Sequence, residues 1–232
     1  MKVLVIIPAY NEEKSLKRVV DHLITKCPQY DYLIVNDGST DRTAQICRQQ
    51  GYHCMNLPIN LGLSGAVQAG MKYAKCKGYD MAIQFDADGQ HLPEYIKKMV
   101  DHMIRKNCDV VIGSRFYGSK MPFRIRTIGA KMISAAIKFT SGKQLSDPTS
   151  GMRLYNRRII EQFVDDENNS PEPDTLSYLL RLGAEIEEVK VEMEERSEGQ
   201  SYLTPINAIK YMVHMLMSIF VFQWFRDGKV VL

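Results

Sequence analysis

The chain has 232 residues, of which 45% are apolar and 25% are charged, so it can build the core of one large domain. This composition excludes disordered, collagen-like and disulfide-rich proteins, and a formal charge of +3 is too small for a general nucleic-acid-binding protein. The five cysteines lack a CxxC spacing and favour a reduced, cytoplasmic setting. The apolar run at the N-terminus ends at Pro8, so no secretion signal is predicted.

The first 112 residues alternate between short apolar runs and amphipathic helical patterns. Strands are predicted at residues 3–7, 32–35, 53–57, 81–85 and 109–112. In the helices between them, the period places Ile24, Leu63 and Ile104 on inward faces. This alternation predicts an α/β fold with a mostly parallel, Rossmann-like sheet that is covered by helices on both faces. Ligands are then expected at the carboxyl ends of the strands.

The second half is less regular. Helical patterns occur at 128–140 and 176–182, a turn is predicted at 147–151, and a strand pattern lies near 189–193. Between Asp109 and Asp147 there are seven Lys and Arg residues and no acid. Such a stretch is either a solvated helix face or a surface that binds anions.

The predicted strand ends carry carboxylates instead of glycine-rich phosphate-binding loops. Neither a GxGxxG turn nor a P-loop is present, which argues against a nicotinamide oxidoreductase or an ATPase. Glu12, Asp37, Asp86 and Asp88 each follow a predicted strand. The last two stand two residues apart, a spacing that suits a hard cation such as Mg²⁺ or Mn²⁺ with substrate phosphates as further ligands.

Four motifs in chain order resemble the signatures of family 2 glycosyltransferases. They are Pro8-Ala9-Tyr10-Asn11-Glu12-Glu13, Val35-Asn36-Asp37-Gly38-Ser39-Thr40-Asp41, Asn60-Leu61-Gly62 and Asp86-Ala87-Asp88-Gly89-Gln90-His91. Within that family the chain is most similar to the dolichyl-phosphate mannose synthase-like branch, over nearly all of residues 1–200. The resemblance implies the GT-A fold of nucleotide-diphospho-sugar transferases. It also implies a catalytic domain over 1–203, with a nucleotide-binding half (1–113) and an acceptor-binding half (114–203).

The resemblance also implies roles for individual residues. The nucleotide sugar is expected to contact Pro8, Ala9, Tyr10, Glu12, Asp37, Asp86 and Ala87. The implied cofactor is Mg²⁺ or Mn²⁺, held by Asp86, Asp88 and Gln90 and acting as a Lewis acid on the leaving diphosphate. The implied catalytic set is Asp88, Asp147, Arg115 and Arg126, in which the arginines, or Arg124, bind phosphate oxygens. His91 is interpreted as a structural or substrate contact outside the metal set.

The segment Asp147-Pro148-Thr149-Ser150-Gly151-Met152-Arg153 resembles a second loop of the family, which faces the sugar and the acceptor. Its alternative interpretation is a simple Pro-Gly turn. An acceptor hydroxyl would need a general base, which Asp147 or an acid within 171–174 could provide. An acceptor phosphate is already an anion, so Asp147 would then only position other groups.

Residues 204–232 are predicted to form an apolar helix and a tail. The most apolar run, 215–225, has about eleven residues and is shorter than the roughly 20 that a membrane span needs. A buried helix, an interface with a partner or a second copy, and a helix on the membrane surface remain as alternatives.

The motifs and the resemblance together predict a metal-dependent glycosyltransferase of cell-wall or polysaccharide biosynthesis, and the resemblance implies that it inverts the anomeric carbon. It would move a hexose from a UDP- or GDP-sugar to an acceptor, for which polyprenyl phosphate is favoured. The predicted location is cytoplasmic and peripheral on the inner membrane face, with a membrane-embedded partner or an oligomer as further options and no nucleic acid bound. One alternative is a transferase that extends a lipid-linked or cell-surface glycan at a sugar hydroxyl. Another is a non-catalytic sugar-nucleotide-binding subunit of a glycan complex.

Overall fold

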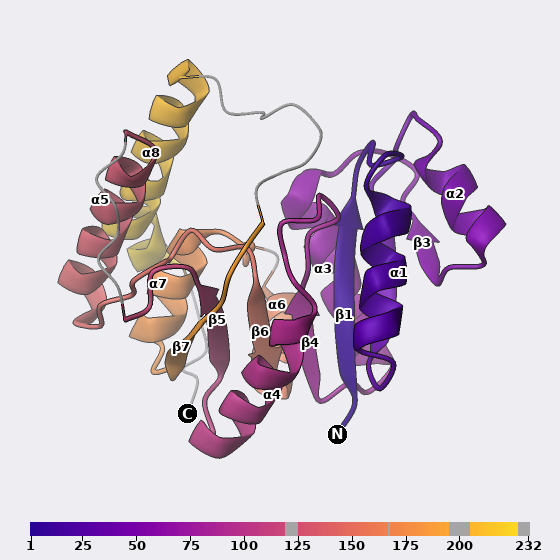
Figure 1. Cartoon of the computed structure of the whole chain (residues 1–232). Coiled ribbons are helices and arrows are strands. Elements are labelled where there is room, and N and C mark those ends of the chain that lie inside the picture. The colour runs from indigo at the N-terminus through magenta and orange to yellow at the C-terminus, as the bar shows by residue number, and fades with distance from the viewer. Residues whose placement is uncertain (119–124, 167, 195–204, 227–232) are drawn as a thin grey trace.

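The computed structural model describes residues 1–118, 125–166, 168–194 and 205–226. Its sheet has the strand order β3-β2-β1-β4-β6-β5-β7, and all strands except β6 run in one direction. This confirms the predicted mostly parallel α/β sheet (Figure 1). The strands are β1 (Val3–Ala9), β2 (Asp31–Asn36), β3 (Cys54–Asn56), β4 (Met81–Gln84), β5 (Val110–Ser114), β6 (Arg153–Asn156) and β7 (Ile186–Lys190).

Helices cover both faces of this sheet, as predicted. The helices are α1 (Leu16–Lys26), α2 (Thr43–Gln50), α3 (Gly62–Cys76), α4 (Glu94–Lys106), α5 (Ile125–Ser141), α6 (Arg157–Asp165), α7 (Pro173–Arg181) and α8 (Pro205–Phe220), followed by the 3₁₀ helix η1 (Phe222–Phe225). One hydrophobic core joins the sheet to α1, α2 and α4, and a second core joins the other face to α3 and α5–α8. Because β1 is buried on both faces, it reads as a continuous apolar run.

The predicted elements of the first half are all present, with ends shifted by one or two residues. Three side chains that were predicted to face inward are exposed, namely Ile24, Leu63 and Ile104. Ile24 and Ile104 lie at the margin of their apolar stripes, beyond Leu23 and Met103, which are buried. Leu63 lies in the first turn of α3, before the buried stripe begins at Ala66.

The sequence did not predict β6 or α6. β6 lies between β4 and β5 and is antiparallel to both. Because β6 runs against its neighbours, it begins at the edge of the sheet where β4 and β5 end. The loop 147–152, which leads into β6, is therefore brought to the carboxyl edge of the parallel strands. The predicted strand near 189–193 is found earlier, as β7, and Met193 instead forms an isolated bridge with His91.

One face of the C-terminal helix α8 belongs to the core of the domain. Met215 and Ile219 are buried in the same hydrophobic cluster as residues of α5 and α7. Figure 1 shows α8 alongside α5, at the end of the sheet opposite to β3. Within the described ranges, none of the helices combines the length and the hydropathy that crossing a bilayer requires.

Candidate active site

The loops that follow β1 and β2 are bonded into one platform at the carboxyl edge of the sheet. The backbone N–H of Asn11 donates to Ser39 Oγ (3.0 Å), and Asn11 Oδ1 accepts from the N–H of Thr40 (2.8 Å). The N–H of Glu13 donates to Asp41 Oδ2 (3.0 Å). Asn11 has a φ of +55°, a conformation that Asn tolerates better than most residues. These bonds fix the position of the residues around Glu12.

Asp37 is buried where β2 ends, and its Oδ1 accepts the backbone N–H of Leu61 (2.7 Å). The next residue, Gly38, has a φ of +65°, and a Cβ there would lie 2.6 Å from the carbonyl carbon of Ile59. A glycine is therefore required for the loop before α3 to close on the end of β2.

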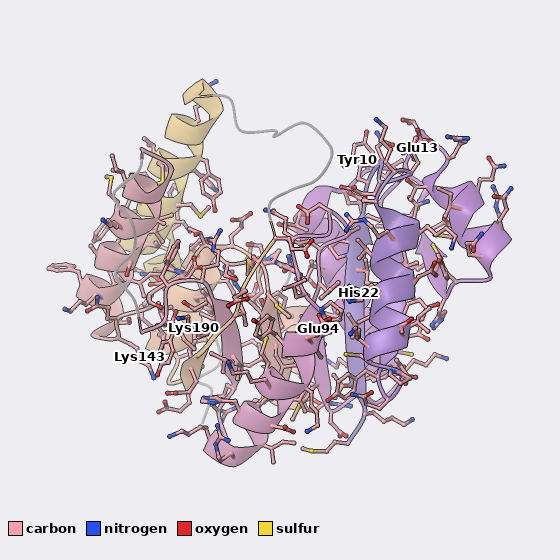
Figure 2. The ribbon with its side chains drawn as sticks, viewed as in Figure 1. Tyr10, Glu13, His22, Glu94, Lys143 and Lys190 are labelled. Carbon is pink, nitrogen blue, oxygen red and sulfur yellow. The ribbon has the colours of Figure 1, made fainter. Side chains whose placement is uncertain are left out.

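The predicted nucleotide-sugar residues come from three adjacent strand ends, because β1 pairs with β2 on one side and with β4 on the other. Figure 2 shows Tyr10 and Glu13 at the edge where β1 ends. Pro8, Tyr10 and Glu12 are half-buried. Ala9 and Ala87 are buried, so only their backbones could contact a ligand.

Asp86 is held from several sides directly after β4. Its Oδ1 accepts from Gln84 Nε2 (3.0 Å), and its backbone N–H donates to His91 Nδ1 (2.9 Å). His91 Nε2 therefore carries the ring proton and lies 3.6 Å from Asp86 Oδ2. Gly151 packs against the same oxygen, since a Cβ on this glycine would lie 2.9 Å from it. The loop 147–152 thus touches the carboxylate that was predicted to bind metal.

The side-chain oxygens around Asp86 suit a hard divalent cation that also binds ligands from outside the protein. Both Asp86 and Asp88 are partly exposed, and Asp88 Oδ1 accepts the backbone N–H of Gln90 (3.0 Å). The amide Nε2 of Gln90 faces the carbonyl of Glu194 (3.5 Å). No group of three His, Cys, Asp or Glu side chains converges within the described residues, so substrate phosphates and water would complete the coordination. His91 does not fit the set, because one ring nitrogen is bonded and the other is protonated.

Arg115 and Asp147 form a two-pronged ion pair. Arg115 Nε donates to Asp147 Oδ2 (2.7 Å), and Nη2 donates to Oδ1 (2.8 Å). The backbone N–H of Arg115 also donates to Oδ2 (3.1 Å), and the hydrogen bonds that the guanidinium donates to Asp147 raise the pKa of Arg115 above its ordinary value. The side chain of Asp147 is 0% exposed. Asp147 is therefore placed to orient Arg115, and it has no access to a substrate proton.

The acids within 171–174 face α8. Glu172 Oε2 accepts from the hydroxyl of Tyr211 (2.6 Å), and the buried Asp174 accepts from Ser218 Oγ (2.5 Å). Burial, and then the charge of Glu172, raise the pKa of Tyr211, so this hydroxyl stays a donor. Both candidate bases thus bond the C-terminal helix.

The structure brings the strand-end carboxylates, Arg115 and the 147–151 loop to one edge of the sheet. The side chain of Arg126 and the whole of Arg124 lie outside the described residues. Gln84 and Glu188 were missed by the sequence reasoning. Gln84 could have been noticed as the polar residue in an apolar strand, and Glu188 accepts the backbone N–H groups of Ser146 (2.8 Å) and Asp147 (3.0 Å).

Comparisons with known proteins agree with this geometry. Residues 4–164 match the family model "Glycosyl transferase family 2". The chain is 30% identical over 220 residues to polyprenol monophosphomannose synthase of Mycolicibacterium smegmatis, covering 89% of this chain and 82% of that protein. It is 33% identical over 218 residues to undecaprenyl-phosphate mannosyltransferase of Micrococcus luteus, covering 88% of each.

Solved structures share the fold at lower identity. Glucosyl-3-phosphoglycerate synthase of Mycobacterium tuberculosis aligns with a TM-score of 0.71 at 18% identity, over 94% of this chain and 79% of that chain. A mannosyltransferase of Pyrobaculum calidifontis in complex with GDP-Man and Mn²⁺ aligns with a TM-score of 0.65 at 16% identity, over 99% of this chain and 65% of that chain.

The fold is that of the GT-A glycosyltransferases, and the carboxylate-lined edge of its sheet is the candidate active site. The chain belongs to glycosyl transferase family 2 and is a glycosyltransferase, as its sequence motifs predicted.

Proposed function

We propose that the chain transfers a hexose from a UDP- or GDP-linked sugar to a polyprenyl phosphate, with inversion at the anomeric carbon. The proposal rests on one observation, namely that each candidate base is already engaged in hydrogen bonds within the protein. Asp147 is buried against Arg115, while Glu172 and Asp174 accept hydrogen bonds from α8. A hydroxyl acceptor would need such a base, whereas a phosphate is already an anion. Undecaprenyl phosphate is also named for the Micrococcus luteus relative.

In this proposal, residues 1–113 bind the sugar nucleotide and residues 114–203 bind the acceptor. Pro8, Tyr10, Glu12 and Asp37 would hold the base and ribose. A divalent cation, Mg²⁺ or Mn²⁺, held by Asp86, Asp88 and Gln90 would stabilise the negative charge on the leaving diphosphate.

Arg115 is proposed to bind the acceptor phosphate. Its Nε and Nη2 are occupied by Asp147, and Nη1 has no hydrogen-bond partner within the described ranges, so Nη1 can donate to a phosphate oxygen. A second oxygen of that phosphate forms the bond to the anomeric carbon. The bond from this carbon to the nucleoside diphosphate breaks, and the diphosphate leaves with the electron pair. No proton has to be removed in this step.

A matched pair of acceptors tests the proposal. Purified protein with Mn²⁺ and a panel of sugar nucleotides is expected to glycosylate a polyprenyl phosphate and not the corresponding polyprenol, because only the phosphate is an anion at neutral pH. Product formation is measured with a radiolabelled donor and extraction of the lipid. Equal transfer to the alcohol, or transfer only to a glycan hydroxyl, would favour the alternative function.

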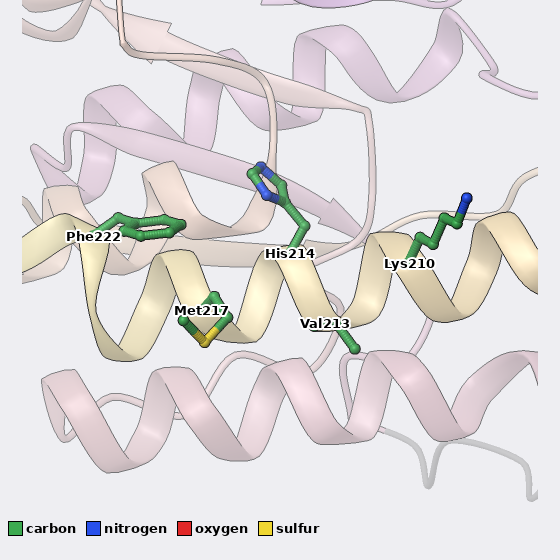
Figure 3. A pocket seen from close by; sticks show the side chains of 5 residues that line it. All are labelled: Lys210, Val213, His214, Met217 and Phe222. Atoms are coloured by element: carbon green, nitrogen blue, oxygen red, sulfur yellow. The ribbon is translucent and has the colours of Figure 1, made fainter.

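We propose further that the protein binds peripherally to the cytoplasmic face of the membrane, where a lipid phosphate would be met. The described parts of α5, α8 and η1 expose ten large apolar side chains, called here together the apolar face, of which Phe139 and Phe220 are in ring contact. Figure 3 shows a shallow pocket along α8 and the start of η1, lined by Lys210, Val213, His214, Met217 and Phe222. The apolar face comprises Ile128, Met132, Phe139, Val213, Met217, Phe220, Val221, Phe222, Trp224 and Phe225.

The charges around the apolar face support an anionic lipid surface as its partner. Residues 125–141 and 205–226 contain no Asp or Glu, while Lys131, Lys138 and Lys210 lie on these helices. Apolar area and basic side chains together are the features of an interfacial surface, and each basic residue adds about 1 kcal/mol of attraction to anionic lipid.

Introducing negative charge into the apolar face is expected to abolish membrane binding. The double variant Met217→Glu, Phe222→Glu should lose co-sedimentation with anionic phospholipid vesicles at low salt, with at least about a tenfold drop in the bound fraction, because buried charge opposes insertion. The matched control is Ile104→Glu, an exposed apolar residue on α4, on the other side of the sheet. Vesicle binding that survives the double variant, or its absence in the wild type, would assign the apolar face to a protein partner or a second copy.

A further inference from the structure

Arg153, the first residue of β6, is a buried cation. It is 1% exposed, and its guanidinium donates to three backbone carbonyls. Nε donates to Ser150 (2.8 Å), Nη2 to Pro148 (2.7 Å) and Nη1 to Glu172 (3.1 Å). None of these bonds goes to a carboxylate. Burying a charge is unfavourable unless its hydrogen bonds are satisfied, and here each of the three guanidinium nitrogens donates to a carbonyl, so the residue is built into a specific structural arrangement.

Two of the three carbonyls belong to the loop that joins the two parts of the candidate site. Asp147 at its start holds the guanidinium of Arg115 through both oxygens. Gly151 at its end lies so close to Asp86 that an added Cβ would be 2.9 Å from Oδ2. Fixing this loop therefore fixes the carboxylate proposed to bind metal and the arginine proposed to bind phosphate.

The third carbonyl anchors Arg153 on the other side. Glu172 lies directly before α7, and its own side chain is bonded to Tyr211 on α8. The guanidinium thus spans the gap between the 147–151 loop and the helices that form the second core. A lysine at the same position would keep the charge, but its single ammonium could not reproduce the planar fork that serves three separate acceptors.

We propose that Arg153 is a positioning residue that holds the 147–151 loop against Asp86 and around Arg115. It does not touch a substrate. This inference rests on the proposed function only in treating Asp86 as a metal ligand and Arg115 as a phosphate ligand.

The test measures metal affinity instead of turnover. Free Mn²⁺ is titrated by electron paramagnetic resonance in the presence of a nucleoside diphosphate, well below the midpoint of thermal unfolding. Arg153→Lys is expected to weaken Mn²⁺ binding about tenfold, the lower end of the range for outer-shell partners of metal ligands, because Arg153 acts on Asp86 only through the loop. The matched control is Arg158→Lys, since Arg158 bonds Asp109 at the opposite end of β6. This control can lower the unfolding midpoint but should leave Mn²⁺ affinity unchanged.

A second variant covers the case in which Arg153→Lys does not fold. Gly151→Ala keeps Arg153 and pushes the loop away from Asp86, so it should reproduce the loss of Mn²⁺ affinity. Wild-type affinity in either folded variant would overturn the proposal, as would a wild-type protein that binds no Mn²⁺. A wild type that binds Mn²⁺ with the expected variant effects, yet transfers no sugar to polyprenyl phosphate, would contradict the acceptor assignment alone and support the role of Arg153.

Discussion

Replacing Asp88 with asparagine is expected to reduce turnover by about 10²–10³-fold, the loss typical of removing one group that stabilises developing charge. Asp88 lies in the turn after β4 and supplies one of the two carboxylates proposed to hold the cation. The amide has nearly the same shape but no charge, so it should weaken the cation and its hold on the leaving diphosphate. The measurement is the turnover number at saturating donor and Mn²⁺.

The fold should survive this change. Asp88 is partly exposed, so the free energy of unfolding is expected to stay within about 0.5 kcal/mol of the wild-type value. Asp101→Asn is the matched control, because Asp101 is an exposed acid on α4 that pairs with Lys97. A turnover number for Asp88→Asn that equals the control would show that this carboxylate has no role in metal binding.

Replacing Arg115 with lysine is expected to raise the KM for the acceptor by about 10- to 100-fold, since a hydrogen bond to a charged group contributes about 1.5–3 kcal/mol. Lysine retains the positive charge but cannot bond Asp147 with two nitrogens and still present a third to phosphate. Donor affinity should change less than about twofold, because Arg115 follows β5 and lies outside the predicted nucleotide set.

A second substitution examines whether the ion pair acts as a unit. Asp147→Asn should also raise the acceptor KM, and the double variant should be no worse than the more damaging single one, because residues in direct contact are not additive. Arg157→Lys provides the control, since Arg157 follows the far end of β6, where it pairs with Glu161 and donates to the carbonyl of Tyr79. Additive effects of the two substitutions would mean that Asp147 acts independently of Arg115.

The parallel part of the sheet was predictable because strands that are buried on both faces appear in the sequence as uninterrupted apolar runs. The run from Val3 to Ile7 is apolar at every position, and its strand is buried on both sides. Because carboxyl ends of parallel strands share one edge, Glu12, Asp37 and Asp86 could be placed together from the sequence alone. Their family motifs gave the same grouping.

The second half was less predictable because its elements depend on long-range pairing. β6 is only four residues long and begins with a charged residue, Arg153, and it is a strand because β4 and β5 pair with it on both sides. α6 has a local signal that was available, since Asn156 is a favourable N-cap whose side chain accepts the N–H of Ile159. The apolar spacing of Ile159, Ile160 and Phe163 spans little more than one turn, too short for a periodic pattern.

Side-chain pairings across the site could not be read from the sequence. Arg115 and Asp147 are 32 residues apart, and they meet only because β6 lies beside β5. For α8, the apolar composition was consistent with a buried helix and with an exposed one. In the structure one face of the helix is buried and the opposite face is exposed. Deleting this helix would remove Met215 and Ile219 from the core, so surface substitutions are the informative variants.

The proposed transfer uses a phosphate anion as its acceptor and needs no general base from the protein. The pH dependence of kcat/KM for the acceptor tests it most directly, using a polyprenyl phosphate and an analogue whose phosphate has a different second pKa. The rate is expected to rise as the phosphate loses its second proton, near a pKa of about 6, and then to stay level. The pH at which the rate rises should shift with the second pKa of the analogue's phosphate. If the rate instead rises at the same pH for both acceptors, a base on the protein titrates there, which would contradict the proposed base-free transfer.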